Sequence, residues 1–241
     1  AGEFILSAYA NENPLFGGDS IPFLATSYDA AQKLYNASKP ATEKLLADQG
    51  LKLLFSVPWP GQSLYSIKPM KTLDDFKGTK MRAYNPATTR IAQLVKAQPV
   101  TIQLAELGQA LATGAVDNFL TSSASGVDSK LYEQTKFFYI VNAWLPRNAT
   151  VVNKKAFDAL DKATQDAVVA AGKVAEERGW ASSRAKDMAH VKDLTENGMA
   201  TGLASDEVRE GLNKIGDTMT EEWIKSAGTD GKAIIDAYRK L

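Results

Sequence analysis

The stretch of sequence that decides the fold is KMRAYNPATTRIAQLVKAQPVTIQLAELGQALATGAVDNFLT, residues 80–121. Its first residues, Lys80–Tyr84, predict a strand, and Asn85-Pro86 then supplies an N-cap and a favoured first helical residue. A helix is therefore expected over Pro86–Ala97. The pattern goes on to predict a strand, a helix and a strand over Val100–Gln103, Ala105–Thr113 and Val116–Thr121. Strands and helices that alternate over short connections are typical of α/β layers with a mainly parallel sheet.

Apolar runs of strand length continue on both sides of this stretch. Between them, Ser122–Gly126 (SSASG) predicts a loop by its composition. No internal repeat or low-complexity linker divides the chain. The further strands that we expect lie over Glu3–Tyr9, Leu51–Val57, Gln62–Ile67, Phe137–Trp144, Ala149–Asn153 and Met199–Leu203.

The last third of the chain predicts long helices. From Thr164 to Glu196 there is no proline, and Ala, Lys, Glu and Arg dominate. If continuous, such a helix would be about 50 Å long, against ~30 Å for an ordinary small domain. It is therefore expected to lie across two lobes. A final helical segment, Thr218–Leu241, is expected to break at Gly228–Gly231.

The composition excludes several classes of function. The 241 residues carry 28 Lys and Arg against 28 Asp and Glu, with one His and no Cys. A balanced charge argues against general affinity for nucleic acid or for an anionic membrane. Without cysteine there are no disulfides, no catalytic thiolates and no Cys-ligated metal sites. No stretch approaches the ~18–20 apolar residues of a membrane span.

No residue pattern proposes a catalyst, a cofactor or a metal ion. His190 falls in the middle of a predicted helix, where a surface or part-buried histidine is usual. Carboxylate pairs such as Asp74/Asp75 and Glu176/Glu177 fall at helix starts or on helix surfaces, where solvation explains them. Gly17-Gly18 lacks the third glycine and the following helix of a phosphate-binding loop.

The pattern favours a binding site instead. Arg82 ends a strand pattern shortly before the predicted N-cap Asn85. A guanidinium beside a helix N-terminus combines a two-point carboxylate contact with the positive end of the helix dipole, although an ordinary ion-paired arginine is the alternative. Aromatic and amide side chains also fall at turns near strand ends. Each alone is more simply explained by core packing, but together they predict the rim of one cleft: Trp59, Gln62, Tyr84, Asn118, Trp144 and Asn148.

Several segments resemble, in order, those of the periplasmic solute-binding proteins of TRAP transporters, the DctP-like family. The first is NENPLFG at Asn11–Gly17, followed by IPFL at Ile21–Leu24. LDDFKGTKMR at Leu73–Arg82 resembles the family element whose arginine grips the substrate carboxylate. ELGQALATGAVD at Glu106–Asp117 and VVNK at Val151–Lys154 resemble two further elements, so the similarity covers nearly the whole chain.

The resemblance implies roles for individual residues. Arg82 takes the place of the carboxylate clamp, and Asn85 is its neighbour at the helix start. Gln62 stands where some members have a second arginine. Thr121 replaces the family's usual Asn, and Asn118 replaces a Gly.

The resemblance also implies a two-lobed α/β fold with a long helix across both lobes. Domain I is expected to comprise residues 1–59 and 148–187, and domain II residues 60–147 and 188–241. The family fold begins with a βαβ unit that is expected to lie before residue 1, so part of domain I would be absent from this chain.

We therefore expect a periplasmic solute-binding protein, monomeric and not an enzyme, that captures a small carboxylate between its lobes for the membrane permease of a TRAP transporter. Trp59, Tyr84 and Trp144 as flat walls favour a hydrophobic or aromatic monocarboxylate. Gln62 in place of an arginine disfavours a dicarboxylate. The alternatives are an α/β enzyme acting on a small carboxylate and an interaction module without a ligand.

Overall fold

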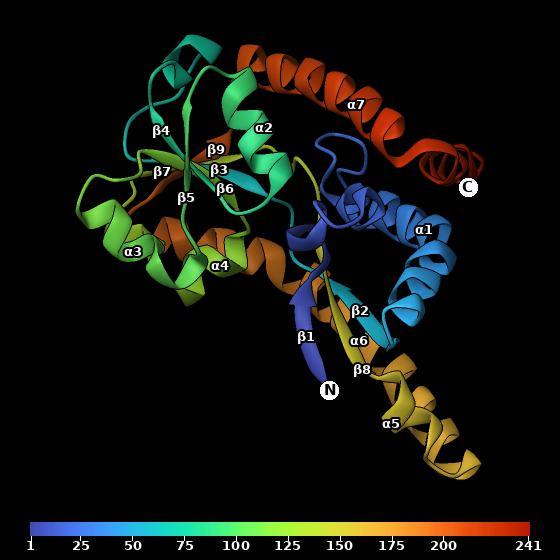
Figure 1. The fold of residues 1–241 in the computed structure, drawn as a ribbon. Helices are drawn as coiled ribbons and strands as arrows, with labels where there is room; N and C mark the ends of the chain where they lie inside the picture. Colours follow the sequence, from blue (N-terminus) through green and yellow to red (C-terminus); the bar gives the residue numbers. More distant parts are fainter.

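The computed structural model describes all residues, 1–241, and contains two sheets joined by crossing segments of chain (Figure 1). The smaller sheet has three antiparallel strands in the order β1-β8-β2. The larger sheet has six strands in the order β5-β4-β6-β3-β7-β9. The three strands of the smaller sheet are β1 (Gly2–Ile5), β2 (Leu51–Pro58) and β8 (Arg147–Asn153).

The larger sheet mixes parallel and antiparallel pairs. Its strands are β3 (Ser63–Ser66), β4 (Lys80–Ala83), β5 (Gln98–Thr101), β6 (Asn118–Thr121), β7 (Phe137–Ile140) and β9 (Ala200–Leu203). Strand β4 runs parallel to β5 and β6, and β7 runs parallel to β9, whereas β3 is antiparallel to both of its neighbours. The expected mainly parallel arrangement is therefore wrong for the smaller sheet and for β3. Strand β3 follows directly from β2 in the other sheet, without a crossover helix of its own to set a parallel direction.

Helices cover the sheets and connect the two lobes. The α-helices are α1 (Tyr28–Asp48), α2 (Pro86–Leu94), α3 (Leu104–Ala112), α4 (Ser123–Asp128), α5 (Lys154–Asp158), α6 (Lys162–Glu196) and α7 (Asp206–Tyr238). Short 3₁₀ segments add η1 (Leu6–Tyr9), η2 (Pro14–Ser20), η3 (Leu73–Phe76) and η4 (Leu131–Glu133). None of the helices combines the length and the apolar character needed to cross a membrane.

Most predicted elements are present, with four local corrections. The strand expected over Val100–Gln103 lies two residues earlier, at Gln98–Thr101. The strand expected over Glu3–Tyr9 ends at Ile5, where the chain turns into η1. The strand expected over Phe137–Trp144 ends at Ile140. Ser122–Gly126 is wrong as a loop, because the side chain of Ser122 caps α4 by accepting the N–H of Ser125 at 3.0 Å. Serine-rich composition indicates helix caps as readily as loops.

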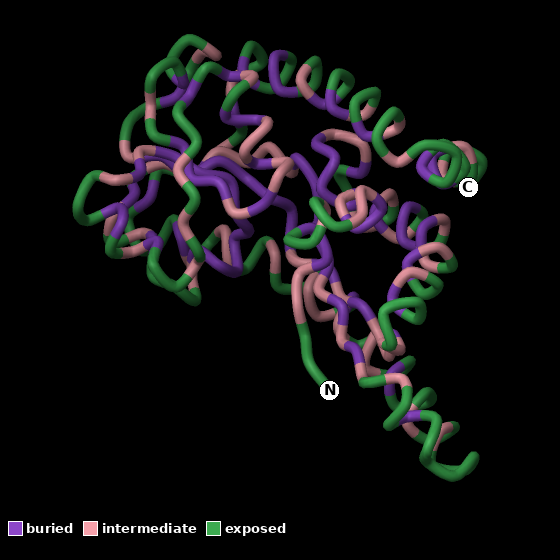
Figure 2. The backbone as a smooth tube through the Cα atoms, viewed as in Figure 1, coloured by how far each residue is buried: buried purple, intermediate pink, exposed green.

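Alternation along the strands gives the larger sheet two buried faces. Leu64 and Leu120 face a cluster that includes residues of α2 and α7, whereas Tyr65 and Phe119 face a cluster with residues of α3 and α6. Successive strand residues point to opposite faces, so each strand contributes to both clusters. In Figure 2 the buried residues concentrate along the central strands of the larger sheet, and the exposed residues along the outer helices.

Helix α6 confirms the long helix predicted to span both lobes. Its 35 residues run along β2 of the smaller sheet and continue to α4 and β9 beside the larger one (Figure 1). Two glycines allow the close approach to β2: a Cβ on Gly172 would lie 2.8 Å from the Leu54 carbonyl oxygen, and one on Gly179 2.5 Å from a Val57 methyl group. The helix is continuous through both glycines.

Helix α7 also packs on both sides of the molecule. Val208 and Leu212 belong to a cluster of the larger sheet, whereas Trp223 and Ile234 pack near α1 and η2. The helix bends at Gly228, which has φ 61° and ψ −143°, within the break predicted at Gly228–Gly231. The division of the chain into two segmented domains stays a prediction. It depends most on α7, because this helix packs on both sides of the molecule.

Candidate functional site

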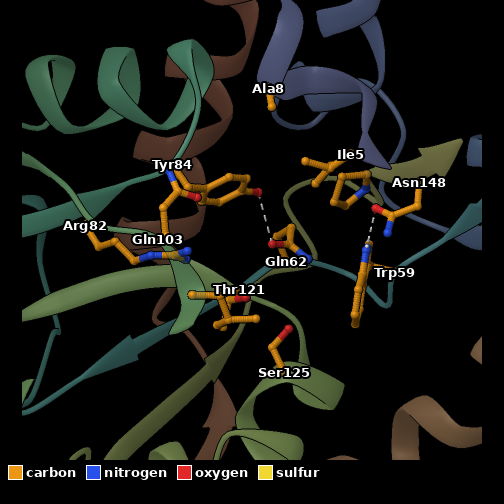
Figure 3. Close-up of a pocket in the computed structure, with 12 residues that line it drawn as sticks. Ile5, Ala8, Trp59, Gln62, Arg82, Tyr84, Gln103, Thr121, Ser125 and Asn148 are labelled. Carbon is orange, nitrogen blue, oxygen red and sulfur yellow. Dashed lines mark hydrogen bonds between the residues drawn. The ribbon is translucent and has the colours of Figure 1, made fainter. Parts of the chain in front are cut away.

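A cavity of about 370 Å³ lies between the two sheets. Figure 3 shows Arg82 and Tyr84 on one side of it, Trp59 and Asn148 on the opposite side, and Gln62 between them. The residues that line it are Ile5, Ala8, Trp59, Gln62, Arg82, Tyr84, Gln103, Leu104, Thr121, Ser125, Pro146 and Asn148.

One wall of the cavity is the edge at which three parallel strands end. Strands β5, β4 and β6 are neighbours, and their carboxyl ends lead into lining residues such as Leu104, Tyr84 and Thr121. Open sheets place ligand sites at this edge because the loops that leave neighbouring parallel strands meet there. The other wall comes from the smaller sheet, through the β1–η1 connection and the crossing segments around Trp59 and Pro146.

Arg82 is buried without a counter-charge. The residue is 4% exposed, and it forms no ion pair with a carboxylate. The Nε–H donates to the Ile102 carbonyl oxygen at 2.8 Å, and the guanidinium carbon lies 4.8 Å from the centre of the Tyr84 ring. Burial lowers the pKa of Arg82, since removal from water disfavours its charged form. Among the lining residues it is the one with a formal charge.

Hydrogen bonds hold the neutral polar groups of the cavity in place. Tyr84 donates its hydroxyl to Gln62 Oε1 at 3.3 Å, and Gln62 Nε2 donates to the Pro60 carbonyl oxygen at 3.1 Å. Burial raises the pKa of Tyr84 and the charge of Arg82 offsets part of that rise, so the phenol is a neutral donor at ordinary pH. Across the cavity, Trp59 Nε1–H donates to Asn148 Oδ1 at 3.0 Å.

The structure brings six of the nine predicted site residues to the cavity and leaves three outside it. Trp144 is fully buried in the core cluster of the larger sheet, so its predicted role as a cavity wall is corrected. Asn118 donates to Thr79 Oγ1 at 2.9 Å, away from the cavity. Asn85 caps α2 by accepting the N–H of Thr88 at 2.8 Å, and it lies beside the cavity without lining it.

Six of the residues that line the cavity are not predicted from the sequence. Gln103 and Leu104 follow the end of β5, a position that the parallel edge would have indicated if that strand had been placed correctly. Ser125 lies in α4, where the composition predicts a loop. No sequence signal marks Ile5, Ala8 or Pro146, because only the crossing of the chain brings them to the larger sheet. No cluster of three or more His, Asp or Glu side chains is arranged to hold a metal ion.

A family model and several solved structures match this chain. The model of the bacterial extracellular solute-binding proteins, family 7, matches residues 4–226. The solute receptor DctP6 of Bordetella pertussis, which binds pyroglutamic acid, is 52% identical, with a TM-score of 0.97 over 100% of this chain and 80% of its own. A TRAP solute-binding protein from a marine metagenome, in complex with co-purified pyroglutamate, is 40% identical, with a TM-score of 0.97 over 100% of this chain and 79% of its own.

Curated relatives are more distant and longer. A solute-binding protein of Sulfitobacter sp. NAS-14.1 is 26% identical over 199 residues, which is 81% of this chain and 59% of that protein. An uncharacterised protein of Haemophilus influenzae is 32% identical over 160 residues, 64% of this chain and 48% of its own length. The chain thus spans about half the length of the curated relatives that it matches.

Proposed function

The chain belongs to the bacterial extracellular solute-binding proteins of family 7, and we propose that it captures a small cyclic monocarboxylate, with pyroglutamate as the first candidate. The family and the similar structures are solute receptors, not enzymes. We propose further that the protein is periplasmic and monomeric, and that it delivers its ligand to the permease of a TRAP transporter.

The observation that carries the proposal is the unpaired charge of Arg82. A buried charge without a partner is unfavourable by several kcal/mol, and a carboxylate that enters the cavity removes that penalty. Two parallel N–H groups of a guanidinium match the two oxygens of a carboxylate. Because Arg82 is the one formal charge among the lining residues, the cavity suits one carboxylate rather than two.

The rest of the lining suits a small ring with amide character. Apolar contact comes from Ile5, Leu104 and Pro146, and a flat indole from Trp59. Hydroxyl and amide groups of Gln62, Gln103, Thr121 and Ser125 offer donors and acceptors to a lactam N–H and C=O. Two similar proteins, 52% and 40% identical to this chain, bind pyroglutamate. This acid is therefore a better first candidate than the aromatic acid expected from the sequence.

Thermal unfolding of the purified protein with each of several acids tests the proposal. Pyroglutamate should raise the melting temperature, since a ligand at a hundredfold excess over Kd adds about 2.7 kcal/mol to the free energy of unfolding. Benzoate tests the aromatic alternative and succinate the dicarboxylate. Tighter binding of either would contradict a site for a cyclic amide acid, and no shift with any acid would favour an interaction module.

A further inference from the structure

A side-chain hydrogen bond joins the 3₁₀ segment η1, on one wall of the cavity, to the start of α2, on the other wall. Asn85 Nδ2–H donates to Ser7 Oγ at 3.0 Å. Ser7 belongs to η1, on the side of the smaller sheet, and Asn85 precedes α2, on the side of the larger sheet. Both residues are buried, with 1% exposure for Ser7 and 7% for Asn85.

The two partners sit next to the ligand cavity without lining it. Ser7 lies in sequence beside Ala8, and Asn85 follows Tyr84, and these two neighbours line the cavity. A second cavity of about 500 Å³ shares Ala8 and Tyr84 with the first, and Asn85 lines it. The hydrogen bond therefore lies beside both cavities.

The sequence orients the amide of Asn85 for this contact. Its Oδ1 accepts the N–H of Thr88 at 2.8 Å as the cap of α2, which leaves Nδ2 as the free end. On the other side, Leu6 is anchored in the core of the smaller sheet and holds η1 in position. The Tyr84–Gln62 bond is different, because the Gln62 backbone is bonded to the crossing segment at Ala143 and Trp144 and can stay attached when the walls separate.

We infer that the Ser7–Asn85 hydrogen bond is a latch between the lobes that retains the ligand, and that Ser7 and Asn85 are positioning residues for the closed state. The inference rests on the proposed function. Opening the cleft exposes both groups to water, and closing it pairs them again. A buried donor that loses its acceptor destabilises the closed state, so removal of the latch should speed ligand release.

The first test measures dissociation of pyroglutamate by stopped flow or surface plasmon resonance. Ser7→Ala should release the ligand about tenfold faster, the change expected for a buried donor left unpaired. Asn85→Ser should do the same, since serine still caps α2 but is too short to reach Ser7. The double variant should be no faster than either single one.

The control is Ser38→Ala, a buried serine of α1 that donates to the Tyr35 carbonyl oxygen away from the cleft. Release from Ser7→Ala at the control's rate would overturn the latch.

A second test needs no ligand. The chain has no cysteine, so spin labels at Gln49→Cys and Ala112→Cys, both exposed, report the distance between the lobes. Ser7→Ala should show a smaller share of the short distance than Ser38→Ala, either alone or with pyroglutamate. Equal shares in both conditions would overturn the latch. If pyroglutamate leaves the distance distribution of the wild-type protein unchanged, the proposed ligand is contradicted. The comparison of the two variants without ligand still tests the latch.

Discussion

Two arginines near the cavity are equally buried, at 4% exposure each, and have opposite surroundings. Arg82 lies at the parallel edge of the larger sheet and has no carboxylate partner. Arg147 begins β8, with its Nε 3.5 Å from Asp19 Oδ2, and its backbone N–H donates to the same oxygen at 2.9 Å. Burial alone therefore does not identify a binding arginine. The missing counter-charge is what distinguishes Arg82 and supports its proposed role, because a folded protein otherwise pairs its buried charges.

The surroundings of Arg147 form a rigid junction between elements. Its guanidinium lies 4.6 Å from the centre of the Tyr35 ring on α1. The Tyr35 hydroxyl donates to Glu176 Oε2 on α6 at 2.6 Å, and that oxygen also accepts the N–H of Ser56 on β2 at 2.9 Å. Arg147 thus joins elements of the scaffold, whereas Arg82 has no carboxylate partner.

Removing the partner of Arg147 should have the largest effect on stability. Asp19→Ala leaves a buried guanidinium unpaired, which should lower the free energy of unfolding by about 3–5 kcal/mol. Denaturant unfolding measures it. A loss no greater than that of a surface variant would mean that water or another group already neutralises Arg147.

Removing Arg82 should affect binding and spare stability. Arg82→Ala should weaken pyroglutamate binding by about 2–5 kcal/mol, and Arg82→Lys should weaken it strongly because lysine has no planar fork. Since the variant removes an unpaired charge, its melting temperature without ligand should not fall. Calorimetry and thermal unfolding check both statements. Near-normal affinity would remove Arg82 from the site, and a large loss of stability would show that it serves the scaffold as Arg147 does.

The phenol of Tyr35 tests the link between the junction and α6. Tyr35→Phe keeps the ring but removes the donor to Glu176, which should lower the free energy of unfolding by about 1–2 kcal/mol, because Glu176 keeps Ser56 and Lys39 as partners. Burial raises the pKa of Tyr35, so the hydroxyl is a proton donor across the neutral range. Affinity for pyroglutamate should be unchanged. A fall in affinity would indicate that the junction also sets the geometry of the cavity.

The surface pair Arg90–Glu222 provides the smallest effect and a baseline. Both side chains are about half exposed, and Arg90 lowers the pKa of Glu222 through a hydrogen bond. A double-mutant cycle should give a coupling of about 0.2–1 kcal/mol that shrinks in high salt. A coupling as large as the loss of about 3–5 kcal/mol expected for Asp19→Ala would contradict the expected difference between buried and exposed ion pairs.

Local sequence signals predicted the elements on which the site depends. Asn85-Pro86 marked the start of α2, and the proline-free run up to Glu196 marked α6. The strand pattern before Asn85 placed Arg82 at the edge of the sheet, and the family resemblance, now supported by a family model over residues 4–226, predicted its role as a carboxylate clamp. Errors arose where one composition is compatible with two structures: the serines at residues 122–126 cap and form a helix, and the segment 141–144 after Ile140 leaves the sheet.

The amino-acid sequence by itself determined the helix caps, the alternation of each strand and the arginine at the end of β4, because these depend on residues a few positions apart. The tertiary structure decided which side chains meet. It buried Trp144 in the core, paired Arg147 with Asp19, left Arg82 without a partner and brought Ser7 to Asn85. Each of these contacts joins residues far apart in the chain, and whether a buried charge finds a partner depends on the packing of both lobes, which no local pattern encodes.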